Sequence, residues 1–178
     1  MKTLYLERST GEVRQGDWVE KLDLEGIARI VVGTGPGSFA GIRSALAFAQ
    51  GYQLGRPEVE VLGLPSPCAI AAGFSGRLAV VGDARQGKAW IALFEDGSML
   101  SEVFQVEADE LSAKVPEGFQ VVTPDARRIG ERLQGLFGGR YLGERLPDAD
   151  GLKRFAEANP AALKPEPLPI YLNPAVRT

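Results

Sequence analysis

The fold is decided by residues 31–43, which read Val31-Val32-Gly33-Thr34-Gly35-Pro36-Gly37-Ser38-Phe39-Ala40-Gly41-Ile42-Arg43. The apolar, β-branched run 27–32 enters this stretch without polar alternation, which predicts a strand covered on both faces. A helix is predicted to follow over 38–54. Phosphate loops use the same strand–turn–helix context. However, Ser38 replaces the third glycine of the dinucleotide-binding pattern, and no lysine follows as in a Walker A loop, so both motifs are excluded.

The glycine turn has a chemical and a purely structural interpretation. Glycine reaches positive φ and lets the backbone approach a ligand closely, and Ser38 is a typical N-cap residue. Amides of Gly35, Gly37 and Ser38 at the helix start, with Arg43 one turn further on, could hold an anion or a nucleotide phosphate. The alternative is that the glycines only turn a tight corner, which Pro36 stiffens.

The predicted helix has two different faces. The larger side chains form the expected core stripe: Phe39, Ile42, Leu46, Ala49 and Gln53. The second face holds only small residues, which recur at helical spacing: Ala40, Ser44, Ala47 and Gly51. Small residues let another helix approach near the short end of the usual range of about 8–10 Å. This face is either covered by the chain's own short helix, predicted over 66–72, or it docks to another chain.

Outward from this segment, the order of the predicted elements repeats. A first antiparallel meander is predicted from three short strands, at 4–7, 12–15 and 17–20. A second meander is predicted from strands at 78–81, 88–94 and 100–106, with turns at 85–87 and at Asp96-Gly97. Helices and strands follow each meander: a strand at 59–62 in the first half, and in the second half a strand at 119–122 and helices at 125–136 and 151–158.

A duplicated unit of meander plus helices is the plan of the two-lobed actin-like (ASKHA) class of nucleotide-binding folds. We therefore predict an α/β, actin-like, two-lobed fold in degenerate form, with mixed sheets. The lobes are expected at 1–76, which would bind the partner, and at 77–178. The alternative from the pattern alone is an ordinary α+β domain.

Composition narrows the classes of function. The 178 residues carry a net charge of −3, which argues against the chain wrapping nucleic acid by itself, because that requires a clustered basic face. There is no histidine and a single cysteine, Cys68. Histidine dyads, histidine metal sites, cysteine zinc clusters and internal disulfides are therefore excluded. No signal-peptide or membrane-spanning pattern is found, so a cytoplasmic location is expected.

The glycine-turn segment resembles the signature of the bacterial TsaB (YeaZ) family. The resemblance rests on residues 32–43, followed by Ala47-Phe48-Ala49-Gln50-Gly51. The stretch Gly82-Asp83-Ala84-Arg85-Gln86-Gly87-Lys88 is similar to the family's second hairpin, and Pro169-Ile170-Tyr171-Leu172 to its C-terminal motif. The match covers most of the chain from Asp23 onward, and it implies the actin-like fold that the repeated elements predict.

The resemblance also implies a non-catalytic function. TsaB is the non-catalytic paralogue of TsaD, the subunit that transfers the threonylcarbamoyl group to form N6-threonylcarbamoyladenosine (t6A) at position 37 of tRNA, and the ATPase TsaE joins the two. TsaB pairs with TsaD through its N-terminal lobe, or with itself as a homodimer, which would place the small-residue face in the interface. The chain would contact transfer RNA only indirectly, through the other subunits of the complex. No cofactor would be firmly bound, apart from a weak ATP or ADP contact at the complex interface.

The chain departs from the family pattern near its N-terminus. Family members usually have a first strand that ends in Asp-Thr and then a long helix, whereas here Leu6-Glu7-Arg8 takes that place. Only about a dozen residues separate Trp18 from Val31, so the first helix is expected to be absent. That helix normally contributes to the pairing surface, which puts the geometry of docking to TsaD in question.

Two functions from different classes remain at this point. Glu7 and Asp83 stand where catalytic members of the class have acidic residues, but the bulky Arg8 follows where a phosphate loop needs close backbone approach. We therefore expect a non-catalytic subunit without a metal. The alternative is a stand-alone small-molecule kinase or ATPase that uses Asp83. The plainest interpretation of Asp83 and Arg85 is a hairpin ion pair worth about 0–1 kcal/mol.

Overall fold

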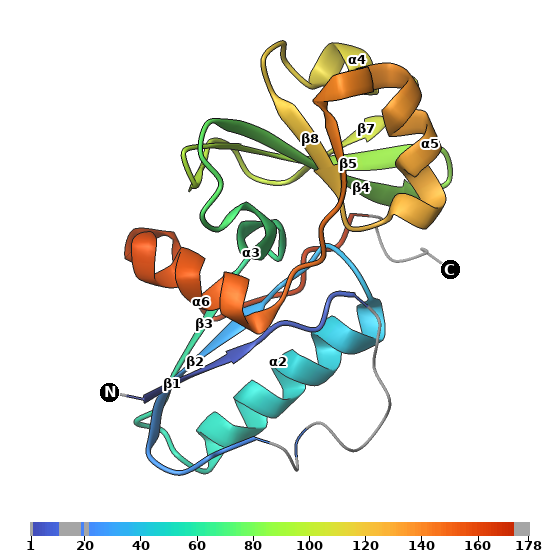
Figure 1. Ribbon diagram of the computed structural model, residues 1–178. Coiled ribbons are helices and arrows are strands. Elements are labelled where there is room, and N and C mark those ends of the chain that lie inside the picture. The colour runs from blue at the N-terminus through green and yellow to red at the C-terminus, as the bar shows by residue number, and fades with distance from the viewer. Residues whose placement is uncertain (1, 11–18, 20–21, 173–178) are drawn as a thin grey trace. The chain divides into compact units, whose positions relative to one another are not determined.

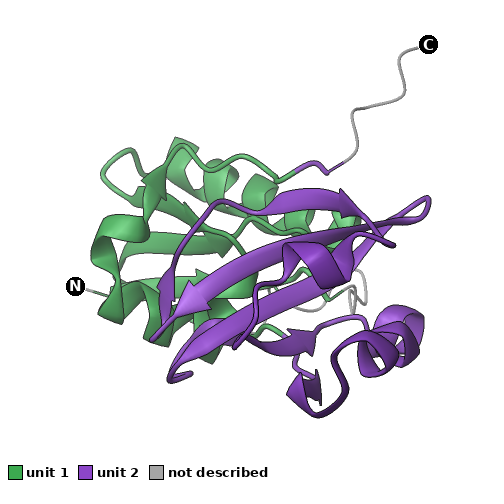
Figure 2. Ribbon diagram, turned by 90° about the horizontal axis from the view of Figure 1, so that it is seen from above, with its two compact units in different colours: residues 1–69, 147–170 green, residues 70–146, 171–178 purple. Residues whose placement is uncertain are grey.

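The computed structural model describes residues 2–10, 19 and 22–172. Its chain divides into two compact units, one of residues 1–69 and 147–170 and the other of residues 70–146 and 171–178 (Figure 2). The sequence predicted a single boundary after residue 76, but residues 147–170 return to the first unit. They do so because α6 (Ala149–Ala158) packs on β1 and β10 (Lys164–Pro165) pairs with β3.

The first unit is built on a four-stranded sheet in the order β1-β2-β3-β10. Strands β1 (Lys2–Leu6), β2 (Ile27–Gly33) and β3 (Glu60–Leu64) are parallel, and β10 is antiparallel to β3. The sheet lies between α2 (Phe39–Leu54) on one face and α6 on the other (Figure 1). Parallel strands need both faces covered, which explains the unbroken apolar run of β2. The strands predicted at 27–32 and 59–62 and the helix predicted over 38–54 are confirmed.

The predicted first meander falls largely on residues that the structure does not describe. The strand expected at 12–15 and most of the one expected at 17–20 lie outside the described residues. Part of the stretch between Trp18 and Val31, from which the family's first helix was expected to be absent, also lies outside them. What the structure does place is β1, which pairs in parallel with β2, from Thr3 opposite Arg29 to Leu6 opposite Val32.

Short helices complete the first unit. The helix α3 (Pro67–Ala71), which spans the boundary between the units, confirms the short helix predicted over 66–72, and a 3-10 helix (Pro160–Ala162) follows α6. Gly151 of α6 lies directly against the carbonyl oxygen of Ala69, so α6 reaches α3 with no space for a side chain at that position. None of the helices in the described part of the chain is long and apolar enough to cross a membrane.

The second unit contains the second predicted meander. Its sheet has the order β6-β5-β4-β8-β9, with β7 also paired to β5. The meander strands are β4 (Arg77–Arg85), β5 (Lys88–Glu95), β6 (Ser98–Met99) and β7 (Phe104–Glu107). The single strand predicted at 100–106 is therefore wrong, because residues 100–103 lie between two shorter strands that both pair with β5. Both predicted turns are present, with positive φ at Arg85, Gln86 and Gly87 and again at Asp96 and Gly97, which two-residue hairpins require. Strands β8 (Gln120–Thr123) and β9 (Tyr141–Glu144) continue the sheet in parallel with β4.

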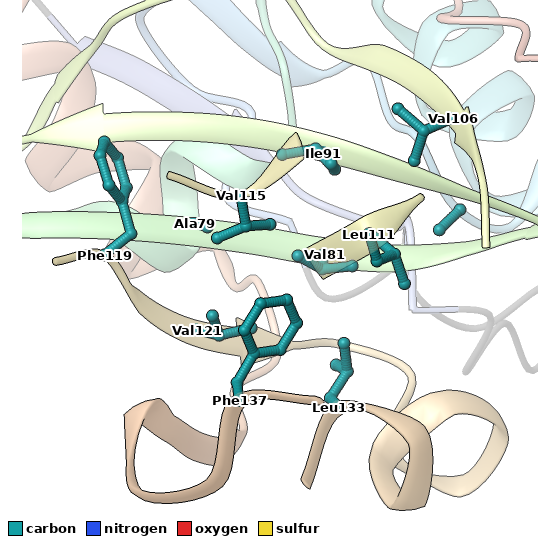
Figure 3. Close-up of a cluster of buried hydrophobic side chains, with 11 residues drawn as sticks. Ala79, Val81, Ile91, Val106, Leu111, Val115, Phe119, Val121, Leu133 and Phe137 are labelled. Atoms are coloured by element: carbon teal, nitrogen blue, oxygen red, sulfur yellow. The ribbon is translucent and has the colours of Figure 1, made fainter. Parts of the chain in front are cut away.

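Two helices cover one face of this second sheet. They are α4 (Leu111–Lys114) and α5 (Ala126–Phe137), and a 3-10 turn (Gly138–Arg140) follows α5. Figure 3 shows their side chains packed on the strands. The cluster is made of the following buried residues: Ala79, Val81, Ala89, Ile91, Val106, Leu111, Val115, Phe119, Val121, Leu133 and Phe137. It gives the second unit a hydrophobic core of its own.

Gly135 in α5 gives a test of this helix. A Cβ built at this position meets nothing within 4 Å, and glycine loses more backbone entropy on folding than alanine does. Gly135→Ala is therefore expected to raise the free energy of unfolding by about 0.5–1 kcal/mol, measured by urea denaturation followed by circular dichroism. A variant less stable than the wild type would contradict the helical packing described here.

Candidate functional site

The glycine turn is clamped by two neighbouring loops of the first unit. The Gly35 amide donates a hydrogen bond to Ser66 Oγ (3.0 Å), and the Ser66 amide donates to the Gly35 carbonyl (2.8 Å). On its other side, the Ser38 amide donates to the carbonyl of Ser9, which follows β1 (2.7 Å). The turn is therefore fixed to the segments that leave β1 and β3.

The start of α2 has the predicted cap. Ser38 has an extended backbone, and its Oγ accepts a hydrogen bond from the Gly41 amide (3.3 Å), so it is an N-cap as expected. The Arg43 guanidinium lies over the Phe39 ring, 4.8 Å from its centroid. The amides of Gly35 and Ser38 already donate hydrogen bonds within the chain. An anion at this turn would therefore have to bind to the Gly37 amide, the Arg43 guanidinium and the first amides of α2.

Glu7 directs its carboxylate into the space beside the glycine turn. Oε1 accepts a hydrogen bond from the Ser9 amide (2.8 Å), and Oε2 is shut off from solvent. A Cβ at Gly33 would overlap Oε2, which explains why β2 must end in glycine. Burial raises the pKa of Glu7, and hydrogen bonding by Ser9 opposes the rise only in part.

The raised pKa of Glu7 makes the stability of the first unit depend on pH. The unfolded chain loses this proton near pH 4.5, whereas the folded protein keeps it to higher pH. The stability contributed by protonated Glu7 is therefore present below pH 4.5 and is lost as the pH rises through the folded pKa. Glu7→Gln keeps the neutral form at every pH, so its stability relative to the wild type should increase as the pH rises.

Urea denaturation of wild type and Glu7→Gln between pH 4 and pH 8 measures this difference. The matched control is Glu131→Gln, which replaces an exposed carboxylate on α5. A difference between Glu7→Gln and the wild type that stays constant over this range would show that Glu7 is not buried as described.

The carboxyl ends of β2 and β3 are covered by the C-terminal segment of the same unit. The Ile170 amide donates to the Thr34 carbonyl (2.9 Å), and Thr34 Oγ1 donates to the Leu64 carbonyl (3.0 Å). A Cβ at Gly63 would lie 2.6 Å from Cβ of Pro167, so this segment rests directly on β3. Open α/β sheets bind ligands outside the carboxyl ends of their strands, and here the chain's own residues lie there.

Asp83 lies at the end of β4 in the second unit, where its carboxylate has several partners. Oδ1 accepts from the Arg85 amide (2.9 Å), and Oδ2 lies 3.2 Å from Nη1 of Arg128 and 3.7 Å from Nε of Arg85. The predicted ion pair with Arg85 is thus present. The Asp83 amide donates to Asp125 Oδ2 (3.0 Å), and burial, followed by the charge of Asp83, raises the pKa of Asp125. Among the described residues, no group of acidic or cysteine side chains is arranged to hold a metal ion.

The core stripe of α2 is largely as predicted, with one error. Ile42, Leu46 and Ala49 are buried, and half-buried Gln53 donates to the Val59 carbonyl (2.8 Å). Phe39 was placed in this stripe wrongly, because its side chain is 57% exposed. It occupies the first position of the helix, where the Arg43 guanidinium lies over its ring.

The small-residue face of α2 is open to solvent. Ala40, Ala47 and Gly51 are exposed, and Ser44 is half-buried, with its Oγ donating to the Gly41 carbonyl (2.8 Å). Sequence reasoning did not include Leu54, which lies one turn after Gly51 and is 85% exposed; its helical spacing was the available signal. The chain's own helix α3 does not cover this face, so a second chain has room to dock there.

Comparison with known proteins identifies the fold. No protein-family model and no curated protein matches the chain. Two solved structures from Pseudomonas aeruginosa do match it, each with a TM-score of 0.62 and 20% sequence identity. One is a protein described as similar to the peptidase YeaZ, with 87% of this chain and 78% of that chain covered, and the other is YeaZ, with 86% and 78% covered. The chain therefore has the mixed α/β, actin-like fold of YeaZ structures.

Proposed function

We propose that this chain is a TsaB-type subunit of the machinery that forms t6A at position 37 of tRNA. In this role it holds a TsaD-type transferase and a TsaE-type ATPase together and does no chemistry itself. The observation that carries the proposal is the open small-residue face of α2 on a fold shared with YeaZ. Transfer RNA is met only through the complex.

The shape of α2 supports docking of another helix. Ala40, Ser44, Ala47 and Gly51 form a stripe with no side chain larger than serine, bordered by exposed Arg43 and Gln50. A partner helix can approach the backbone closely along this stripe. Phe39 and Leu54, at the two ends of the helix, are exposed large apolar residues. A partner that docks on this face can bury apolar surface against these two side chains, around the close contact between the helices. When no partner subunit is present, a second copy of this chain is expected to take the same face.

A non-catalytic role is supported by how the candidate sites are filled. Glu7 and the segment that contains Pro167 and Ile170 lie where a ligand of the first sheet would bind, and both oxygens of Asp83 contact neighbouring groups. The absence of histidine from the sequence removes the usual proton-transfer group. A nucleotide is therefore expected only as a weak contact shared with a partner.

A pull-down with the TsaD-type subunit of the same organism, with and without ATP, tests the proposal. The tagged chain should retain that subunit, show no turnover alone, and be required when t6A formation is reconstituted with the TsaE-type ATPase. Failure to bind the subunit under both conditions would refute the proposal. Phosphate release by the isolated chain that vanishes in Asp83→Ala would instead favour a small-molecule kinase or ATPase.

A further inference from the structure

Helix α5 presents one side to the second sheet and leaves another side exposed to solvent. Leu133 and Phe137 point toward the strands in Figure 3 and are buried in the core of this unit. On the exposed side, Arg128, Arg132 and Leu136 follow one another at intervals of four residues, so they line up along the helix. All three are exposed, Leu136 to 41%. These three residues form the arginine stripe of α5.

The arginines of α5 stand at positions where their charges destabilise the helix itself. Arg127 and Arg128 lie in its first turn, which holds no acidic residue, and cations there face the positive end of the helix dipole. Arg128 and Arg132 are like charges four residues apart, and such pairs repel each other on a helix. The stability of α5 therefore does not explain these charges. Residues that break a local rule of stability are expected at functional sites, which favours a role in binding.

Partners within the chain neutralise only part of this charge. Arg128 Nη1 lies 3.2 Å from Asp83 Oδ2, and the guanidinium has further N–H donors on its other nitrogens. Glu131 stands four residues after Arg127, the spacing at which opposite charges on a helix attract each other. Arg132 is exposed and forms no ion pair with any other described residue. The stripe therefore carries a net positive charge beside an exposed leucine.

An acidic helix matches the stripe better than RNA or a second copy of this chain does. Residues four apart on α5 are about 6 Å apart along its axis, and carboxylates one turn apart on a partner helix have the same spacing. RNA would contact the arginines through its phosphates, which gain nothing from Leu136 and are repelled by Glu131. In a symmetric pair of two copies, the same arginines would face each other.

We propose that the arginine stripe of α5 binds an acidic helix of a partner protein. Carboxylates one turn apart on that helix would pair with Arg128 and Arg132, and an apolar side chain would pack on Leu136. The complementary charges would set the choice of partner and the rate of association. A Cβ built at Gly135, beside the stripe, meets nothing within 4 Å, so the partner has space to approach. The stripe shares no residue with the small-residue face of α2, so the proposal stands whether or not the chain works in t6A formation.

The test uses the full ¹⁵N-labelled chain and a fluorescein-labelled helical peptide of four Glu-Ala-Ala-Leu repeats. The peptide should bind with a Kd below about 1 mM in fluorescence anisotropy, and the shifted amides in NMR spectra should centre on residues 127–136. A neutral peptide of four Gln-Ala-Ala-Leu repeats should bind at least about fivefold more weakly.

Variants of the stripe locate the contact. Arg132→Gln should weaken binding of the acidic peptide about three- to fivefold, because one exposed charge pair contributes up to about 1 kcal/mol. Leu136→Gln should weaken it about two- to fivefold, because apolar contact is lost. Both variants replace an exposed residue with a good helix former, so both should unfold in urea at the wild-type midpoint or close to it. Arg154→Gln on α6 is the matched control for charge and should leave Kd unchanged.

Three results would overturn this proposal. The first is equal binding of the acidic and neutral peptides, or of the acidic peptide by the wild type and Arg132→Gln. The second is tighter binding of a uridine oligonucleotide than of the acidic peptide at the same salt concentration, which would assign the stripe to RNA. The third is a concentration-dependent shift of the amides of residues 127–136 without peptide, which would assign it to a second copy of this chain.

Discussion

An arginine in place of Ala47 is expected to abolish the pairing of this chain with a partner subunit and leave its fold intact. Ala47 is exposed in the middle of the small-residue face of α2. Arginine favours helices almost as well as alanine does, so the isolated chain should keep its stability. In a close helix contact the long charged side chain has no space and loses its hydration. We expect affinity to fall at least 100-fold, which corresponds to about 2.7 kcal/mol.

Light scattering of the isolated chain and a pull-down with the TsaD-type subunit both measure this effect. Gln134→Arg is the matched control, because it adds the same charge at an exposed position of a different helix, α5. The control should associate like the wild type. If Ala47→Arg also associates like the wild type, α2 does not form the interface, and the proposed function loses the observation on which it rests.

Alanine in place of Gly82 is expected to destabilise the second unit by about 1–3 kcal/mol. Gly82 lies in β4 directly beneath the indole of Trp90 on β5, and a Cβ at Gly82 would overlap the ring. Trp90 is 2% exposed, so surrounding core residues restrict the movement that would relieve the overlap. Urea denaturation followed by circular dichroism measures the loss.

A double variant separates this contact from a general effect of alanine. Gly82→Ala combined with Trp90→Leu should be less destabilised than the sum of the two single variants, because leucine leaves space for the added methyl group. Gly135→Ala provides the comparison at a glycine with open surroundings, where a gain in stability is expected. A neutral Gly82→Ala would show that β4 and β5 do not approach as closely as described.

The elements that sequence reasoning predicted correctly are those specified by neighbouring residues. The strand before the glycine turn, the N-cap at Ser38 and helix α2 follow from apolar runs and capping chemistry within one segment. The turn at Asp96-Gly97 follows from the positive φ that two-residue hairpins require, which both residues adopt. Local chemistry was sufficient in each case.

The elements that sequence reasoning missed depend on partners far along the chain. β10 consists of two residues, one of them Pro165, and exists only because β3 is beside it. β9 is short and contains Gly143, which has a positive φ, so its sequence resembles that of a loop. The return of residues 147–170 to the first unit likewise depends on long-range packing of α6 on β1, which no local pattern reports.

For the candidate site, the periodicity of α2 predicted which flank would be free of large side chains, and Ala40, Ala47 and Gly51 are exposed. It could not predict that Phe39 lies outside the core, because this depends on where the sheet ends relative to the first turn of the helix. Nor could it predict the engagement of Gly35 by Ser66 or the position of Glu7 against Gly33. These contacts join loops that follow different strands.

The discontinuous first unit has a consequence for synthesis on the ribosome. All six strands of the second sheet lie between Arg77 and Glu144, so that unit can close as soon as this stretch has emerged. The first unit has to wait for α6 and β10, although its own N-terminal strand is made first. The nascent chain is therefore expected to complete its later-made half before its earlier one, with residues 2–69 exposed to chaperones in the meantime.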